Sequence, residues 1–202
     1  MTAIHSVIKP LVAVAVAAAV LLAACAQSPQ KITLAPSFPA PEQAIGNKQP
    51  VHVRVSDDRR DKVLGSRGGA YRDTALITLG ESLSLAIQPA LKDHLKALGF
   101  EVDSLSPQTT DLHVVFESLV YNHPDTDGVG HPMDMEAQVR VEAVRQNSRY
   151  EGRYKIKRQE KFFNAPSEPH NEEMVNKLVV DVLENMLADA KLQNFLLDKS
   201  ND

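Results

Sequence analysis

The strictest pattern in this sequence of 202 residues is an alternation of apolar and polar side chains between Met133 and Val144. The apolar positions are Met133, Met135, Ala137, Val139, Val141 and Ala143, and the polar positions are Asp134, Glu136, Gln138, Arg140 and Glu142. Successive side chains of a β-strand point to opposite faces of the sheet. The pattern therefore predicts a strand that buries one face and exposes the other, as in an antiparallel sheet covered on one side only.

Other segments show the same period. Residues 51–55 (VHVRV) alternate, and Phe100 with Val102 begins a short strand. Asp111 to Tyr121 is predicted to place Leu112, Val114, Phe116 and Val120 on one face. Arg149 to Phe163 is predicted to bury Tyr150, Tyr154 and Ile156, and residues 146–148 have the length of a hairpin link.

Two segments have helical spacing instead. The first is predicted to place Leu79, Leu83, Ala86 or Ile87, Ala90 or Leu91, Leu95 and Leu98 on one face, to kink or restart at Pro89 and to end at Gly99. The second runs from Glu172 to about Leu197. The resulting order, β-α-β-β-β-β-α, predicts an α+β fold: a two-layer sandwich with a mainly antiparallel sheet and two helices packed on one face.

The N-terminus has the composition of an export signal. Residues 1–10 contain one lysine and no acid, and residues 11–24 are apolar. A helix of that length spans about 21 Å, which is short of the roughly 30 Å hydrocarbon core of a bilayer. The pattern favours a cleaved signal peptide over a membrane-spanning helix.

The end of this apolar segment is more specific. Leu22-Ala23-Ala24-Cys25 resembles the bacterial lipobox, in which a signal peptidase cuts before a cysteine that then carries a diacylglycerol and an N-acyl chain. Cys25 is the only cysteine in the chain, so an ordinary signal peptide with an incidental cysteine is the weaker alternative. Several acyl chains form a stable anchor. By the same resemblance, Ala26 indicates sorting to the outer membrane.

These observations predict three parts. Residues 1–24 are a lipoprotein signal peptide, residues 25–50 are a lipidated cysteine with a Pro-rich tether, and residues 51–202 are a single α+β periplasmic domain. A flexible tether of that length would span about 25–30 Å. The segment from Ile32 to Leu34 is the one part of the tether that could form a short edge strand.

The stretch SDDRRDKVLGSRGGAYRD, from Ser56 to Asp73, is rich in basic residues and glycine. Its glycines match neither GxxxxGK[ST] nor GxGxxG, the patterns of nucleotide-binding loops. It is a long connection for a link between a strand and a helix. The basic residues Arg59, Arg60, Lys62, Arg67 and Arg72 are therefore candidates for binding a partner or an anion, the alternative being a solvated loop whose Asp–Arg pairs fix turns.

Two other groups of polar residues are candidate sites. The segment HPDTDGVGH, from His123 to His131, holds suitable donors for a metal, but its Pro, Asp and Gly residues are also those of a turn, which we favour. The basic residues of the last strand are Arg149, Arg153, Lys155, Lys157, Arg158 and Lys161. They predict either cross-strand pairs with Glu136 and Glu142 or a basic face for anionic lipid or glycan.

Composition and motifs argue against several classes of function. A net charge of −4 argues against a general nucleic-acid binder. No GxSxG motif is present, and His52, His94, His113 and His170 have no neighbouring nucleophile in the sequence. We expect no enzyme activity, no metal and no cofactor apart from the covalent lipid on Cys25.

Several segments together resemble the YajG-type lipoproteins of Gram-negative bacteria. They are the lipobox at Cys25, KITLAP from Lys31, V-x-V-x-V-S-D-D-R at Val51 to Arg59, LKALGFEV, and the closing VVDVLENMLADAKLQNFL. The resemblance covers nearly the full chain, and its motifs are structural, so it implies an uncharacterised outer-membrane lipoprotein without catalytic residues to carry over. We expect a non-enzymatic envelope protein with a membrane anchor and a periplasmic protein or cell-wall partner, an accessory to envelope assembly or maintenance. The alternative is a binder or sensor of a small anionic ligand or cell-wall glycan through the Arg-rich loop.

Overall fold

The computed structural model describes residues 29–68, 72–104, 106–124 and 130–198. Its larger sheet has the strand order β5-β2-β6-β7-β8 and its smaller sheet the order β1-β4-β3. The strands are β1 (Gln30–Ile32), β2 (Pro50–Asp57), β3 (Val63–Ser66), β4 (Leu76–Leu79), β5 (Glu101–Val102), β6 (Thr110–Asn122), β7 (His131–Arg145) and β8 (Ser148–Phe162). The helices are α2 (Leu83–Ala97), α3 (Glu168–Leu187) and α4 (Ala190–Leu196).

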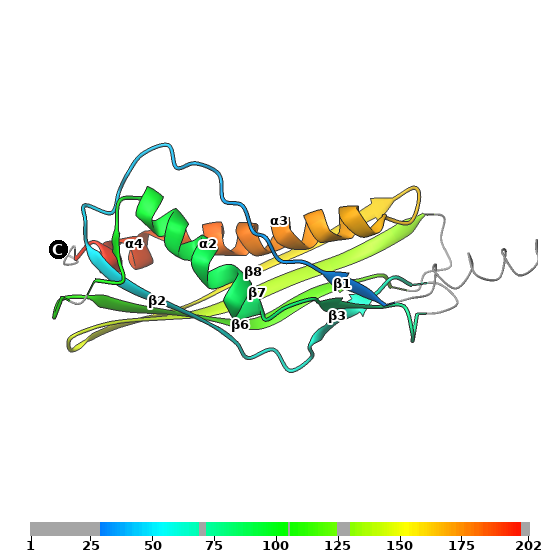
Figure 1. Ribbon diagram of the computed structural model, residues 1–202, viewed down its shortest axis with the longest axis horizontal. Helices are drawn as coiled ribbons and strands as arrows, with labels where there is room; N and C mark the ends of the chain where they lie inside the picture. Colours follow the sequence, from blue (N-terminus) through cyan, green and yellow to red (C-terminus); the bar gives the residue numbers. More distant parts are fainter. Residues whose placement is uncertain (1–28, 69–71, 105, 125–129, 199–202) are drawn as a thin grey trace, which may run out of the picture.

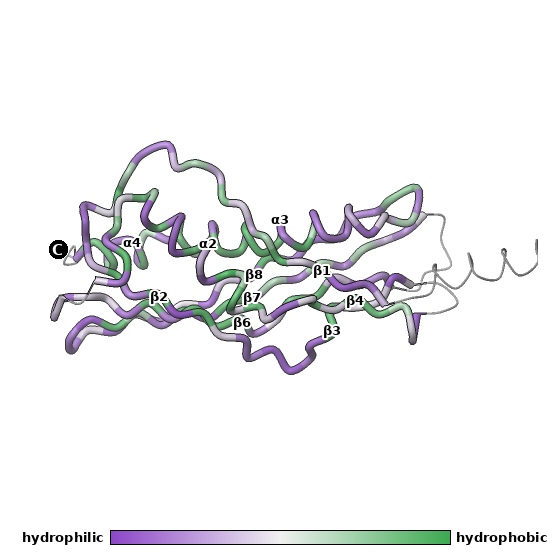
Figure 2. Tube along the Cα trace, in the orientation of Figure 1, coloured by the Kyte–Doolittle hydropathy of each residue, from purple (hydrophilic) through white to green (hydrophobic). Residues whose placement is uncertain are grey.

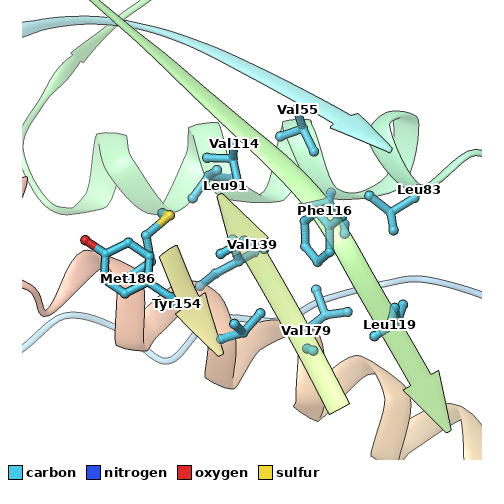
Figure 3. Close-up of a cluster of buried hydrophobic side chains, with 14 of the residues drawn as sticks. Val55, Leu83, Leu91, Val114, Phe116, Leu119, Val139, Tyr154, Val179 and Met186 are labelled. Carbon is cyan, nitrogen blue, oxygen red and sulfur yellow. The ribbon is translucent and has the colours of Figure 1, made fainter. Parts of the chain in front are cut away.

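The three helices lie on one face of the five-stranded sheet, which confirms the predicted α+β sandwich (Figure 1). Apolar residues gather between the two layers (Figure 2). The inward side of β7 contains every apolar residue of the predicted alternation, and none of them is more than 2% exposed. Leu83 and Leu91 of α2 and Val179 and Met186 of α3 meet Val139 and Phe116 from the sheet (Figure 3).

The long ladders β6–β7 and β7–β8 are antiparallel, as predicted. β2 is different, because it pairs in parallel with both β5 and β6. Between β2 and its neighbours β5 and β6, the chain passes through α2. A helical crossover of this kind brings the next strand back parallel to the first. The sheet is therefore mixed.

The sequence prediction for β6 is correct only in its first half. Leu112, Val114 and Phe116 face the core, but Leu119 and Tyr121 are buried beyond them, and Val120 is only partly buried. The register with β7 shifts between Phe116 and Ser118, so Glu117 is an extra residue in β6. A β-bulge of this kind reverses which residues face inward, and this is why the prediction that Val120 shares the face of Phe116 is wrong.

Both predicted helices have different ends in the structure. Leu79 belongs to β4, which pairs with β1 and β3, and α2 begins behind Ser82 and runs without interruption through Pro89 to Ala97. Gly99 has φ +89° just after this helix, as expected of a terminating glycine. The predicted second helix is divided into α3 and α4, because the Asp189 side chain accepts hydrogen bonds from Lys191 N and Leu192 N and starts a new helix.

The segment from Gln30 to Gln49 packs against the domain, so the prediction of a tether reaching to Pro50 is wrong for these residues. β1 pairs in parallel with β4, and Ile32 and Leu34 are buried in the core. The Asn176 side chain of α3 accepts a hydrogen bond from Ala35 N at 2.7 Å and donates one to Thr33 O at 2.9 Å. We call residues 33–49 the strap, because Figure 1 shows them crossing the helical layer from β1 to β2.

The strap is held at its middle and at its end. The Phe38 ring stacks on the His94 ring of α2, with centroids 4.5 Å apart, and burial of His94 lowers the pKa of this histidine. Ile45 N and Gly46 N donate to Leu98 O at 2.9 and 2.7 Å. The folded domain therefore begins near Gln30. Within the described residues, no helix combines the length and the apolar character needed to cross a membrane.

Candidate functional site

A recess in the described surface lies where β2 separates from β6. The two strands pair from Val51 and Thr110 to Asp57 and Phe116, and Asp58 N still donates to Phe116 O at 3.0 Å. The chain then leaves the sheet edge and returns through β3 near the end of β6. There Ser66 N donates to the Asn122 side chain at 3.1 Å, and His123 N donates to Ser66 O at 3.2 Å.

Between these two points, the edge of β6 is open over residues 117–120. No strand of the described chain pairs with this stretch on the β2 side. The gap is a cavity of 710 Å³, which we call the edge cavity. Its lining consists of residues 58–61, residues 63–65, residues 117–120 and Asn122.

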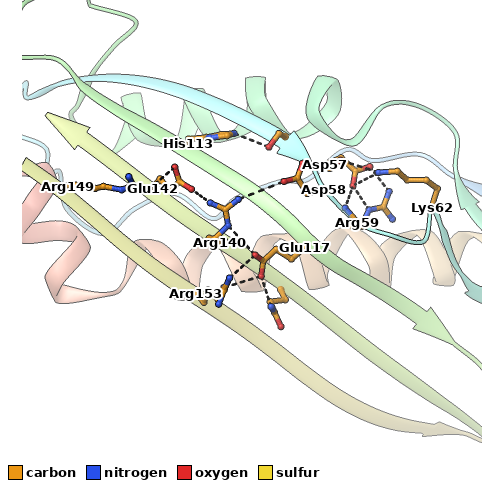
Figure 4. Close-up of polar contacts among 12 residues, drawn as sticks. Asp57, Asp58, Arg59, Lys62, His113, Glu117, Arg140, Glu142, Arg149 and Arg153 are labelled. Atoms are coloured by element: carbon orange, nitrogen blue, oxygen red, sulfur yellow. Dashed lines mark hydrogen bonds and ion pairs between the residues drawn. The ribbon is translucent and has the colours of Figure 1, made fainter.

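Arg59 is the most buried charged residue of this region, with only 5% of its surface exposed. Its Nε and Nη2 atoms donate to the two carboxylate oxygens of Asp57 at 2.8 and 2.9 Å, a bidentate geometry (Figure 4). The third nitrogen, Nη1, is buried and has no hydrogen-bond partner in the structure. Arg59 also lines the edge cavity, so this unpaired nitrogen belongs to a residue of the cavity wall.

Asp57 balances this buried cation. Lys62 Nζ lies 3.1 Å from Asp57 Oδ1 on the solvent side. Burial alone raises the pKa of Asp57, but the hydrogen bonds from Arg59 and Lys62 outweigh it, and the net shift of this pKa is downward. The carboxylate is therefore ionised at neutral pH.

The bulge residue Glu117 connects the edge cavity to the polar face of the sheet. Its carboxylate accepts hydrogen bonds from Gln138 at 2.7 Å and from Arg140 Nε at 3.2 Å, and it pairs with Arg153 at 3.4 Å (Figure 4). Burial raises the pKa of Glu117, but these donors and charges lower it by more, so that the net shift of this pKa is downward. The extra residue in β6 thus places a carboxylate between two arginines of neighbouring strands.

Arg140 lies at the centre of this charge network. It also pairs with Glu142 on its own strand and lies 3.9 Å from Asp58 at the rim of the edge cavity. Arg149 continues the network from Glu142 toward the β7–β8 hairpin. These ion pairs hold exposed side chains of β6, β7 and β8 in place.

The five basic residues predicted as a binding patch do not form one cluster. Arg59 and Arg60 line the edge cavity, and Lys62 lies beside it on Asp57. Arg67 pairs with Glu168 of α3 at 2.8 Å, and Arg72 lies 3.6 Å from Asp73. The stretch is divided because residues 63–66 form β3, so the description of residues 56–73 as one long loop is wrong.

Arg149, Arg153, Lys155 and Arg158 of β8 have acidic partners on neighbouring elements. Lys155 pairs with Glu136 at 2.9 Å, and Arg149 pairs with Glu142 at 3.5 Å. Arg158 is on the other face of the strand and pairs with Asp181 of α3 at 2.6 Å. These contacts favour cross-strand and strand–helix pairing over a basic binding face.

The histidines of the segment 123–131 approach each other at one end of the sheet. The His123 and His131 rings are 5.4 Å apart in an edge-to-face arrangement. Burial and the neighbouring His131 lower the pKa of His123. Residues 125–129 and Cys25 lie outside the described ranges, and within those ranges no three His, Cys, Asp or Glu side chains gather in a way that could hold a metal ion.

Sequence reasoning missed Glu117 and the open edge. One signal was present: Glu117 and Ser118 interrupt the apolar alternation of β6 in the middle of an otherwise regular strand. An interruption of that kind is consistent with a bulge. The position of the gap depends on where β2 leaves β6, which only the folded chain shows.

Comparison with known proteins agrees with the fold and with the predicted lipoprotein family. A family model described as "Uncharacterized lipoprotein" matches residues 36–197. The uncharacterized lipoprotein YajG of Escherichia coli K12 is 25% identical over 186 residues, which cover 87% of this chain and 91% of YajG, and YajG of Escherichia coli O6:H1 matches equally well. In fold, the chain is similar to protein XCC0632 of Xanthomonas campestris, a member of the DUF330 family, with a TM-score of 0.51 and 6% identity over 86% of this chain and 98% of XCC0632. The chain belongs to the YajG-type family of uncharacterized lipoproteins.

Proposed function

We propose that this chain is a non-enzymatic lipoprotein of the cell envelope, anchored in the outer membrane by lipid on Cys25, whose domain binds an extended segment of a periplasmic protein at the edge cavity. The role would be that of an accessory to envelope assembly or maintenance. Membership of a lipoprotein family supports the anchor, and the lipobox pattern indicates Cys25 as the lipidated residue. The observation that carries the binding proposal is the open stretch of β6 at residues 117–120 beside a cavity of 710 Å³.

An open strand edge is suited to an added peptide strand. Four residues of β6 offer about 13 Å of edge at 3.3 Å per residue, enough for a short extended segment. The cavity volume lies in the usual range of about 300–1,000 Å³ for binding pockets. The unused Arg59 Nη1 donor would take a carbonyl or carboxylate oxygen of the incoming segment.

The test is site-specific photo-cross-linking in living cells. A photoreactive residue at Asp61, which is exposed at the cavity rim, should give a discrete cross-linked product, and the same residue at Asn185 on the exposed side of α3 should not. Ser118→Tyr would fill the cavity and should abolish the product from Asp61 without lowering the unfolding midpoint. A product that survives Ser118→Tyr, or that appears equally from Asn185, would show that the partner binds elsewhere.

A small anionic ligand is the second candidate, and the unused Arg59 donor favours it. Arg60 adds a second cation to the same cavity, but Asp58, Asp61 and Glu117 line it too, so the charges around it are mixed. This alternative predicts no cross-linked protein and a rise in melting temperature with succinate or inorganic phosphate. Arg59→Gln should remove that rise.

A further inference from the structure

The start of β1 limits how far the domain can lie from its anchor. Gln30 is only 4% exposed, and its side-chain amide donates to Glu168 O and accepts from Asn171, both at 2.8 Å. Residues 26–29 alone separate this docked residue from Cys25. A fully extended chain covers at most about 18 Å over that interval.

This reach is short in relation to the length of the domain. β7 and β8 have 15 residues each, which corresponds to about 50 Å of strand. The start of β1, the end of β8 and the start of α3 lie together at one end of the molecule, and the C-terminal helix α4 lies toward the other (Figure 1). If Cys25 carries lipid, the end that contains the start of β1 is the end near the membrane.

That same end has an exposed aromatic residue. We call residues 163–167, between β8 and α3, the tip. Phe163 is 87% exposed, whereas the preceding Phe162 packs edge-to-face on His170 at 5.3 Å between ring centroids. Lys161, two residues before Phe163, is exposed as well. The other large apolar side chains exposed in the described part of the chain are Leu85 on α2 and Val144 at the opposite end of β7.

We propose that the tip is a membrane-contact surface, in which Phe163 enters the headgroup layer of the bilayer and the Lys161 ammonium meets lipid phosphate. The inference rests on the lipidation of Cys25 proposed above. Aromatic rings are favoured at the level of the headgroups, and a lysine stem can extend its charge toward phosphate. The sandwich then stands on the membrane, with α4 and the β7–β8 hairpin directed away from it.

The chain contains no tryptophan, and this permits a direct test. Phe163→Trp places a single indole at the tip, and Val144→Trp and Leu85→Trp place matched probes at the far end and on α2. The full-length lipidated protein is reconstituted into vesicles of phosphatidylethanolamine and phosphatidylglycerol, with and without a brominated-acyl phosphatidylcholine. The Phe163→Trp fluorescence should be quenched severalfold more by the brominated lipid than that of either control, and its emission should shift to shorter wavelength.

Two readouts separate this inference from the anchor itself. Flotation of the vesicles first reports whether the protein is anchored, and a lipidated preparation that does not float would contradict the anchor and the orientation together. If the protein floats but all three probes are quenched equally, or Leu85→Trp is quenched most, the tip does not contact the membrane. All three substituted residues are exposed, so an unchanged urea midpoint is expected and serves as the folding control.

Discussion

The Asp57–Arg59 pair shows how two neighbouring residues can hold a strand end in place. The side chain of Arg59 is 4% exposed and that of Asp57 is 20% exposed, so both charges are largely removed from water. Removing a charge from water is costly, and the bidentate contact compensates for this cost only while both partners are ionised. The pair fixes the point at which β2 separates from β6. It therefore defines the edge of the cavity on the side of β2.

We predict that Asp57→Asn lowers the free energy of unfolding by about 3 kcal/mol at neutral pH, because it leaves the buried Arg59 without its counter-charge. The pKa of Asp57 is lowered in the folded state, so its stabilising contribution is present above the unfolded pKa of about 4 and is lost as pH falls through the folded pKa. Urea unfolding at neutral and acidic pH would measure both effects, and the variant should lose less stability on acidification than the parent.

Asp103→Asn is the matched control. Asp103 pairs with Lys92 at 2.8 Å, but its side chain is 45% exposed, and loss of a surface pair of this kind costs less than about 1 kcal/mol. Equal losses in the two variants would contradict the assignment of a structural role to the buried pair.

At the scale of elements, the domain depends on a segment that precedes the regular sheet. β1 and the strap contribute Ile32 and Leu34 to the core, and the amide of Asn176 binds their backbone as a strand partner would. The segment also covers the helices, since Phe38 stacks on His94 of α2. The helical layer is therefore completed by a piece of chain that is neither helix nor long strand.

A fragment that begins at Val51 should be much less stable than one that begins at Pro29. Burial of one large aliphatic side chain contributes about 1.5–3 kcal/mol, so the loss of Ile32 and Leu34 together should cost about 3–6 kcal/mol. The measurement is the urea midpoint of the two purified fragments, followed by circular dichroism. Equal midpoints would mean that the strap only rests on the helices without stabilising them.

At the scale of the whole molecule, the fold is an elongated sandwich with its N-terminal attachment at one end and the C-terminal helix toward the other (Figure 1). The similarity to XCC0632 extends over nearly all of that protein at 6% identity, so it is the arrangement of the chain that the two share. The polar face of the sheet is ordered by ion pairs from Asp58 to Arg149, while the opposite face is covered by helices. The open stretch of β6, residues 117–120, lies between the end of β2 and β3.

We expect Cys25→Ala to abolish lipidation, because in the anchor proposed above the Cys25 sulfur receives the diacylglycerol. Metabolic labelling with palmitate should lose its signal, and the protein should disappear from the outer-membrane fraction. Ser28→Ala, three residues away, is the control and should be labelled and sorted like the parent. Retention of the palmitate label in Cys25→Ala would contradict the anchor.

Much of the secondary structure was accessible from local patterns. The alternation in β7 and the inward positions Tyr150, Tyr154 and Ile156 of β8 follow from a period of two, and the helical spacing of α2 and α3 follows from a period of 3.6. Element ends are predicted less accurately: the helical spacing includes Leu79, which instead pairs within the three-stranded sheet. For the candidate site, the sequence indicated Arg59 and Arg60 but included Arg67 and Arg72, which lie with other partners.

Local patterns in the sequence predict which face of β7, β8, α2 and α3 is apolar and to which family the chain belongs, because these properties are written in residues close together along the chain. The parallel pairing of β2 with β6, the bulge at Glu117 and the docking of residues 30–49 on the helices become visible only in the folded chain. These features depend on contacts such as Asn176 with Ala35, which are 141 positions apart. Local periodicity carries no information about such contacts, and the open edge of β6 results from them.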